Sequence, residues 1–142
     1  MHVETILQAK GSAVFTVSVE ASIAEAVAAL NRHRIGALVV TDGDGSVAGI
    51  LSERDIVRHL DADASQVLKR KVRECMTAKV ITADPRASVA ELMERMTQSR
   101  IRHIPIVENG ELVGIVSIGD VVKRKIEQTE QEASALREYI AS

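Results

Sequence analysis

The chain has 142 residues, a formal net charge of −2 at pH 7, 46% hydrophobic residues and only 1% aromatic residues. This composition supplies neither the positive charge that attracts a polyanion nor the rings that stack on single-stranded nucleic acid, so we expect no nucleic-acid partner. No apolar run approaches the roughly 20 residues of a membrane span, and a single cysteine, Cys75, excludes an internal disulfide and fits a reducing compartment. We therefore expect a cytoplasmic protein with no membrane contact.

The first half of the chain is predicted to form a β-α-β-β-α unit behind a short N-terminal helix. Ser22, with Glu25 three residues later, is a capping-box signature that opens a helix. The run Ile35–Thr41 is almost continuously apolar, which is typical of a strand buried on both faces, and the Asp42–Gly45 turn leads into a hairpin strand. The expected elements are helices at 3–9, 22 to about 33 and 52 to about 60, and strands at 14–19, 35–41 and 47–51.

The second half of the chain repeats the first. The segment Gly49–Asp55, G-I-L-S-E-R-D, recurs as G-I-V-S-I-G-D at Gly114–Asp120, and eight further residues recur 66 positions downstream. This period is outside the about 20 to 50 residues of solenoid repeats, so it indicates a duplicated small domain. The second unit is expected to have strands at 80–83, 101–107 and 112–116 and helices at 89–98 and 119 to about 126.

These patterns divide the chain into a first copy at 12–60, a connector at 61–79, a second copy at 80–126 and a C-terminal helix at 127–142. Each copy alone would be marginal, because a unit of about 60 residues buries only about 60% of its unfolded surface. We therefore expect the copies to pack on each other in an α/β (α+β) fold, with a short connector helix at 67–72.

The C-terminal helix carries an apolar stripe. Ile126, Ala133, Leu136 and Ile140 are spaced 7, 3 and 4 residues apart, like the contact positions of a coiled coil. A stripe of this kind requires a partner surface, which is either the core of the same chain or a second copy of the protein.

Each copy passes from a strand to a helix through the pattern S-x-x-D, as Ser52 with Asp55 and Ser117 with Asp120. The pattern is itself a helix-capping signature, and the helix dipole favours an acid in the first turn. Both copies use Asp where reciprocal capping prefers Glu or Gln, and both place a glycine three residues before the serine, where a backbone can approach another group. A carboxylate can also accept both vicinal hydroxyls of a ribose. Capping and ligand binding are therefore both open.

A cationic cluster, in the run S-R-I-R-H-I-P-I-V at 99–107, leads into the buried strand of the second copy. Arginine suits phosphate, and His103 adds a hydrogen-bond donor. The first copy has Gly36–Ala37 where the second has Arg102 and His103. We therefore expect two sites of unequal strength, with the stronger site at Asp120.

Each copy resembles a CBS domain, and the pair resembles the tandem CBS, or Bateman, module over roughly residues 12 to 126. The resemblance rests on T-V-x-x-x-x-S-I-x-E-A at Thr16–Ala26 and its echo at Thr82–Leu92, on R-x-R-H-I-P-I-V at Arg100–Val107, and on the two G-h-h-S-x-x-D endings. Each motif is weak alone, but the ordered set, occurring twice, is specific. The resemblance implies two β-α-β-β-α repeats packed as a pseudo-two-fold pair.

The same resemblance implies a homodimer that binds adenosine ligands in clefts between the repeats, AMP first, with ADP, ATP, NAD(H) or S-adenosyl compounds as further candidates. The implied ligand-binding residues are Asp55 and Asp120 at the ribose hydroxyls, Ser52 and Ser117 near ribose or phosphate, the ligand-contacting threonines Thr16 and Thr82, Arg54, Arg102 and His103 at the phosphates, and Ile104 and Pro105 on the adenine-facing strand.

No catalytic motif accompanies this predicted site. Cys75 has no companion motif and is interpreted as a buried structural thiol, and the four histidines lack the spacing of a catalytic metal site. We therefore expect a regulatory sensor without enzyme activity, metal or catalytic cofactor, acting on an unknown partner protein. The alternative is a structural or dimerisation module with empty clefts, but such a cleft would not require Arg102 and His103. The basic run Lys69–Lys71 is explained more simply as a solvated face of the connector than as a nucleic-acid contact.

Overall fold

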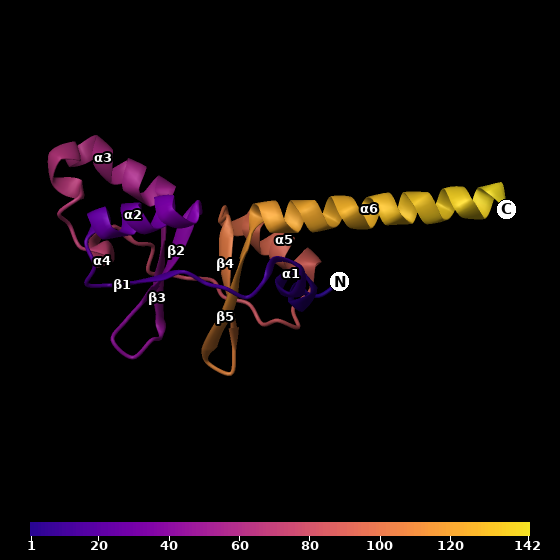
Figure 1. The fold of residues 1–142 in the computed structure, drawn as a ribbon, viewed down its shortest axis with the longest axis horizontal. Coiled ribbons are helices and arrows are strands. Elements are labelled where there is room, and N and C mark those ends of the chain that lie inside the picture. Colours follow the sequence, from indigo (N-terminus) through magenta and orange to yellow (C-terminus); the bar gives the residue numbers. More distant parts are fainter.

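The computed structural model of the protein describes residues 1–142 as two similar units that lie side by side, with one long helix projecting beyond the second (Figure 1). The first copy consists of β1 (Thr16–Ser18), α2 (Ile23–His33), β2 (Ala37–Thr41), β3 (Val47–Ser52) and α3 (Glu53–Val67). β2 lies between a parallel β1 and an antiparallel β3. Its residues Ala37–Val40 are all buried, which confirms the strand predicted from the apolar run.

The second copy has the same layout with one difference. It consists of α5 (Val89–Ser99), β4 (His103–Glu108), β5 (Glu111–Ser117) and α6 (Ile118–Ala141). The strand predicted at 80–83 is wrong, because only Ala83 pairs with the sheet, donating its N–H to Pro105 O at 3.1 Å and accepting from Val107 N–H at 2.9 Å. A turn at Asp84 and a proline at Pro85 follow at once, and proline cannot extend the hydrogen-bond ladder.

Two short helices precede the copies and occupy equivalent places. α1 (Val3–Lys10), predicted at 3–9, packs on the second copy, where Val3 N–H donates to Ala87 O at 2.9 Å. α4 (Val72–Cys75) packs on the first copy, where Val72 N–H donates to Ala21 O at 2.8 Å. The helix predicted at 67–72 is wrong, because α3 runs on to Val67 through a kink at Asp63 and α4 begins only at Val72.

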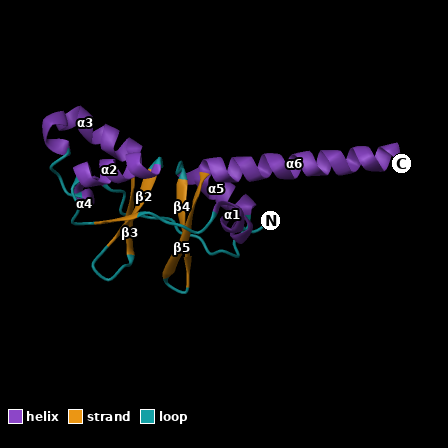
Figure 2. Cartoon of the chain, viewed as in Figure 1, coloured by secondary structure: helices purple, strands orange, loops and turns teal.

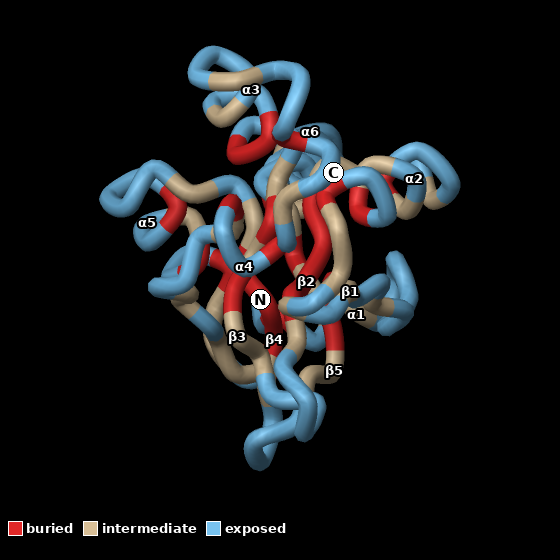
Figure 3. Tube along the Cα trace, turned by 90° about the vertical axis from the view of Figure 1, so that its left-hand side faces the viewer, coloured by how far each residue is buried: buried red, intermediate tan, exposed pale blue.

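Each copy has its own hydrophobic core, and the buried segments follow the central strands (Figure 3). The first core includes Val72 and Cys75 of α4, and the second includes Val3 and Ile6 of α1. The preceding helix therefore contributes to the core of each copy. These added helix residues enlarge each core and so stabilise copies that would be too small to be stable alone.

The second-copy helix and the C-terminal helix form one continuous helix, α6, of 24 residues. Its C-terminal half extends away from both sheets (Figure 2), and Leu136 and Ile140 are 59% and 73% exposed. The apolar stripe of the tail therefore does not fold back onto the core of the chain. None of the helices is both long and apolar enough to cross a membrane.

Candidate functional site

A cleft with a volume of about 440 Å³ lies between the two copies. This volume falls within the about 300–1,000 Å³ typical of sites for small molecules. Its walls are Gly36, Ile50, Ser52–Asp55 and Arg58 of the first copy, Thr77 and Lys79–Ile81 before the second copy, and Ser99–His103 of the second copy. The connector residues Thr77 and Lys79 thus close a space that neither copy could form alone.

The carboxylate of Asp55 lies where α3 begins. Ser52 N–H donates to Asp55 Oδ2 at 2.9 Å, and Asp55 N–H donates to Ser52 Oγ at 3.3 Å, so the two residues form a reciprocal capping box. The other oxygen, Oδ1, accepts from the Thr77 hydroxyl at 3.3 Å. Asp55 is only 7% exposed, yet Oδ1 retains acceptor capacity, since each carboxylate oxygen has two lone pairs. The capping role is therefore present, and the N-terminus of α3 adds an anion-favouring dipole to the cleft wall.

Gly49 explains how the connector comes so close to Asp55. A Cβ at this glycine would lie 2.7 Å from Thr77 O and 2.8 Å from Met76 Sδ. The lack of a side chain lets Thr77 pair with β3 at Ile50, through hydrogen bonds of 3.0 and 2.8 Å. The close approach expected before the serine is thus an approach of the protein's own chain.

The cleft is strongly positive. Its walls carry the guanidinium or ammonium groups of Arg54, Arg58, Lys79, Arg100 and Arg102 against only two carboxylates, those of Glu53 and Asp55. This excess of three positive charges stands in a chain whose net charge is −2. Such a cleft attracts an anion that carries several charges.

Arg102 and His103, which the sequence assigns to the Asp120 site, also face the Asp55 cleft, and the charge of Asp120 still acts on His103. Both line the cleft that contains Asp55, because the two copies face each other and the loop before β4 lies across the start of α3. A nucleotide site at Asp55 thus gains the basic pair that its own copy lacks. The ranking of the two sites by strength stays a prediction, and this placement favours Asp55.

His103 is half-buried and lies among charged neighbours. Burial lowers the pKa of its imidazole, as does the positive charge of Lys10 and, more weakly, that of Arg102, while Asp120 and Glu53 act in the opposite direction. The ring is therefore mostly neutral near neutral pH, with a donor and an acceptor nitrogen. A phosphate placed beside it would raise its pKa and draw a proton onto it.

Arg100 has an unusual backbone. It ends α5 in the left-handed conformation, with φ 54° and ψ 42°, and the equivalent Arg34 ends α2 with φ 53° and ψ 47°. Glycine is the usual residue at this position of a helix end, because a Cβ is strained there. Because Arg34 shares this conformation and does not line the cleft, the left-handed backbone is a feature of both duplicated helix ends, and Arg100 alone brings a cation to the cleft wall.

Six of the residues predicted to bind ligand lie outside this cleft. Ile104 is fully buried in the second core, and Pro105 is buried beside it, so neither side chain reaches the cleft wall. Thr16 and Thr82 are exposed, and neither lines the cleft. Ser117 and Asp120 form a second capping box, with Ser117 N–H donating to Asp120 Oδ2 at 2.8 Å. Ser52, Arg54, Asp55, Arg102 and His103 are the five that the structure brings together.

Sequence reasoning missed several wall residues. Arg58 lies one turn after Arg54 on α3, a spacing that could have placed both on one face. Thr77 and Lys79 belong to the connector, and no local pattern marks them. The basic run before them has another role in part, since Lys71 Nζ pairs with Glu20 Oε2 at 2.7 Å and Arg73 pairs with the same carboxylate.

Other reactive groups lie apart from the cleft. Cys75 is a free cysteine that is 3% exposed, and burial raises the pKa of its thiol, which disfavours the nucleophilic thiolate. The structure contains no cluster of three or more His, Cys, Asp or Glu side chains that could hold a metal ion. Neither Cys75 nor a metal cluster therefore adds a group to the cleft.

Comparison with known proteins gives a consistent result. A family model described as the CBS domain matches residues 11–62 and 72–127. The mitochondrial CBS domain-containing protein CBSX3 of Arabidopsis thaliana is 37% identical over 123 residues, which cover 84% of this chain and 60% of CBSX3. The chain thus spans less than two thirds of that relative.

Two solved structures share the fold. The CBS-domain containing protein ATU1752 from Agrobacterium tumefaciens superposes with a TM-score of 0.84 at 45% identity, covering 87% of this chain and 92% of that one. The CBS domain pair of protein MJ0100, in complex with 5′-methylthioadenosine and S-adenosyl-L-methionine, superposes with a TM-score of 0.78 at 28% identity, covering 90% and 98%. The fold predicted from the duplication, two repeats packed as a pair, is confirmed.

Proposed function

The chain belongs to the CBS domain family, and on that premise we propose that it is a regulatory module without catalytic activity that binds an adenosine nucleotide in the cleft at Asp55. One observation carries the proposal. The cleft joins a carboxylate suited to ribose hydroxyls to five basic side chains suited to phosphates, and these come from both copies and the connector.

The ligand that fits this cleft has a ribose and at least one phosphate. The MJ0100 pair, with the same fold, binds two adenosine compounds that carry no phosphate, which supports recognition of the adenosine part. The excess of positive charge in the present cleft supports a phosphate as well. AMP, ADP, ATP and NAD(H) are the proposed ligands, and AMP is the smallest that satisfies both requirements.

Binding to purified protein tests the proposal directly. Isothermal titration calorimetry with AMP, ATP and NADH should show saturable heat for at least one of them. Adenosine, which lacks the phosphate, and GMP, which lacks the adenine, are the matched controls and should bind more weakly. If none of the adenine nucleotides gives heat at near-millimolar concentration, the proposed function is wrong.

Regulation requires a surface that transmits ligand occupancy to another protein chain. We propose that this surface is the exposed apolar row of α6, which joins two copies of the protein as a homodimer. Ile118, Val122 and Ile126 on its first half are 44%, 47% and 53% exposed, and Leu136 and Ile140 continue the row. With Thr129 and Ala133 between them, these residues repeat every three or four positions, which is the spacing of a coiled-coil contact.

The lone free Cys75 fits the reducing cytoplasm as the compartment of the protein.

The self-association of α6 can be tested by a matched pair of variants. Leu136→Glu places a charge in the apolar row and should shift the protein from dimer to monomer in sedimentation velocity at micromolar concentration. Gln131→Glu adds the same charge on the opposite face of the helix and should leave the dimer unchanged. Monomeric wild-type protein would contradict the proposed dimer.

One observation favours the alternative of a structural module with empty clefts. Both Asp55 and Asp120 already have full capping roles, so neither carboxylate requires a ligand to explain its presence. The five basic groups around Asp55 are what this alternative leaves without a purpose, since like charges gathered in one cleft destabilise the folded chain. The titration above separates the two functions.

A further inference from the structure

The carboxylates of Asp55 and Asp120 have the same capping partners but different third partners. Asp55 accepts from the neutral hydroxyl of Thr77 at 3.3 Å. Asp120 Oδ2 instead accepts from the ammonium of Lys10 at 2.7 Å. The side chains of Lys10 and Asp120 are 32% and 22% exposed, so this ion pair is partly shielded from water and is stronger than an ordinary surface pair.

Lys10 holds this position because α1 is a longer version of α4. The two helices begin in equivalent places on the two copies, but α4 has four residues and α1 has eight. After α4, the chain pairs with β3, and Thr77 N–H donates to Ile50 O at 2.8 Å. At the end of α1, Lys10 Nζ donates to Ile115 O at 2.9 Å, on the strand equivalent to β3. One ammonium group thus takes the place of the Thr77 N–H and of its hydroxyl.

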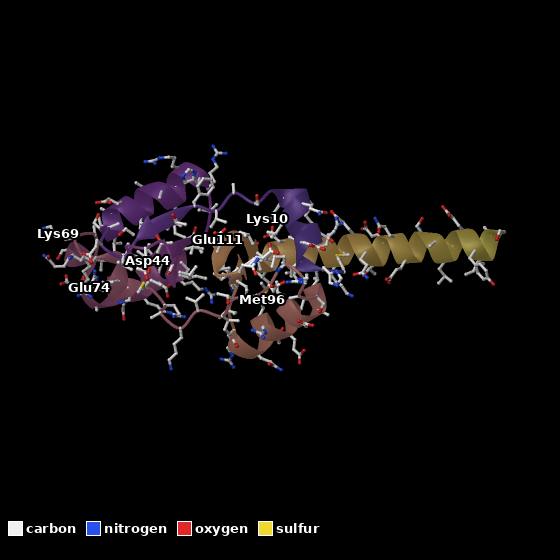
Figure 4. The ribbon with its side chains drawn as sticks, turned by 90° about the horizontal axis from the view of Figure 1, so that it is seen from below. Lys10, Asp44, Lys69, Glu74, Met96 and Glu111 are labelled. Carbon is white, nitrogen blue, oxygen red and sulfur yellow. The ribbon has the colours of Figure 1, made fainter.

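The second motif glycine fixes α1 over this place. A Cβ at Gly114 would lie 2.6 Å from Leu7 Cδ2, so the glycine makes the recess into which Leu7 packs. Figure 4 labels Lys10 where α1 approaches the base of α6. The pocket that Lys10 and Asp120 line measures about 110 Å³ and has walls from α1 and α6 alone, whereas the pocket beside Asp55 measures about 440 Å³ and has walls from both copies. The pocket at Asp120 is smaller than the about 300 Å³ at which sites for small molecules begin.

The surroundings of Asp120 still contain groups for an anionic ligand. Lys123 and Arg124 line the small pocket together with Glu127, whose Oε2 accepts from Arg124 Nη1 at 2.9 Å, while Arg124 Nε is buried without a hydrogen-bond partner. Lys123 is also the counterpart of Arg58 in the first cleft, 65 positions away. Burial would raise the pKa of Asp120, but the hydrogen bonds from Lys10 and Ser117 outweigh it and lower the pKa, so the carboxylate stays charged.

We propose that the Asp120 cleft is a second adenosine-nucleotide site that Lys10 keeps closed from within, so that each chain binds one nucleotide at Asp55 and none at Asp120. This inference rests on the proposed function. Removal of the Lys10 ammonium opens the second cleft and exposes Asp120 to a ribose. The second site is weaker, because Gly119 stands where the first copy has Arg54, and Gly36 and Ala37 stand where the second copy has Arg102 and His103.

The number of nucleotides bound per chain tests the proposal. Calorimetry with ATP should give one site for wild-type protein and two for Lys10→Met, which keeps most of the side-chain length but loses the charge. The second site should be about tenfold weaker, for one fewer charged hydrogen bond. Lys10→Arg, which keeps a cation at this place, should stay at one site, and the double variant Lys10→Met with Asp120→Asn should return to one.

The outcomes separate this inference from the function on which it rests. Two sites in wild-type protein, or one site in Lys10→Met, would overturn the closed cleft and leave nucleotide binding intact. If wild-type protein binds no ATP but Lys10→Met binds one, the function assigned to the Asp55 cleft fails and the closed cleft stands. No binding to either protein overturns both. Circular dichroism should confirm that all variants are folded, and an NMR titration should show a higher pKa for Asp120 in Lys10→Met than in wild-type protein.

Discussion

Asp55 and Asp120 end the same seven-residue pattern, but different segments of the chain pack beside the two carboxylates. Around Asp55, the connector contacts the carboxylate through the Thr77 hydroxyl, leaves a cleft beside it and adds Thr77 and Lys79 to the walls of that cleft. Around Asp120, the N-terminal helix lies directly over the carboxylate and supplies Lys10. The repeated motif sets the cap and the carboxylate in both copies, while the segment that packs beside each carboxylate differs: the connector lies at Asp55 and the N-terminal helix at Asp120.

This difference shows why a motif alone does not locate a ligand site in a duplicated fold. Arg102 and His103 belong to the second copy by sequence, yet both line the cleft that contains Asp55 of the first copy. The walls of the Asp55 cleft therefore come from both copies. Variants made in pairs, one at each equivalent position, test this comparison.

The largest difference in nucleotide affinity is expected between the asparagine variants of Asp55 and Asp120. Asp55→Asn keeps a capping oxygen but loses the charge, and loss of charged hydrogen bonds to the ribose should weaken AMP or ATP binding by about 10- to 100-fold. Asp120→Asn should change the affinity by less than about twofold, since Lys10 already occupies that carboxylate. Calorimetry on both variants measures the difference, and equal losses would remove the distinction between the sites.

Alanine variants of the two motif glycines, Gly49 and Gly114, should differ in their free energy of unfolding. Gly49→Ala would press a methyl group against the backbone oxygen of Thr77, so we expect the free energy of unfolding in urea to fall by about 1–3 kcal/mol. Gly114→Ala meets only the end of the flexible Leu7 side chain, and adjustment of its rotamer should limit the loss to about 1 kcal/mol. A larger loss for Gly114→Ala would mean that α1 is held more rigidly than the connector.

Glycine variants of the two left-handed arginines, Arg34 and Arg100, should have the same effect on stability but different effects on ATP binding. Arg34→Gly and Arg100→Gly both remove a strained Cβ and should each stabilise the protein by up to about 1 kcal/mol in thermal unfolding. Only Arg100→Gly removes a cation from the open cleft, and it should weaken ATP binding by about fivefold. Unchanged binding in Arg100→Gly would show that this side chain does not contact the phosphates.

The smallest effect is a pH dependence that arises from His103. Because its pKa is lowered in the free protein, the folded chain binds fewer protons than the unfolded chain below about pH 6.5, and this group makes the protein less stable as the pH falls through that range. A bound phosphate raises the same pKa, so nucleotide binding takes up a proton and strengthens at lower pH.

The variant His103→Gln removes the group that takes up this proton, so comparison with wild-type protein measures its contribution to ATP binding. The ratio of ATP affinities, wild-type protein to variant, should rise by about threefold between pH 8 and pH 6, while the titration of ATP itself cancels in the ratio. Adenosine, which has no phosphate, provides the control and should show no such rise. A ratio that is flat with pH would place the phosphates away from His103.

Local patterns in the sequence were enough to predict much of this fold. Ser22 and Ser52 begin helices as their capping signatures indicate, and the apolar run at β2 is buried throughout. The run at 80–83 misled, because β-branched residues favour a strand wherever they occur, but Val80 and Ile81 line the cleft instead. Local propensity therefore identified elements but could not show where the chain departs from the sheet.

The site was less predictable, since its members meet only through the packing of the two copies. Asp55 and Arg102 belong to different repeats, and the partner of Asp120 is Lys10, 110 positions away and outside the repeats. Arg58 and Lys79 look like solvated surface charges in the sequence. Their convergence on one cleft depends on the arrangement of the two copies, which no short pattern encodes.

The most direct measurement is a crystal structure of the protein grown with saturating ATP. The ribose hydroxyls should lie against the Asp55 carboxylate, with the phosphates among the basic side chains of that cleft and Lys10 still bound to Asp120. A nucleotide seated at Asp120 with Lys10 displaced, or an Asp55 cleft that stays empty at saturation, would contradict the assignment.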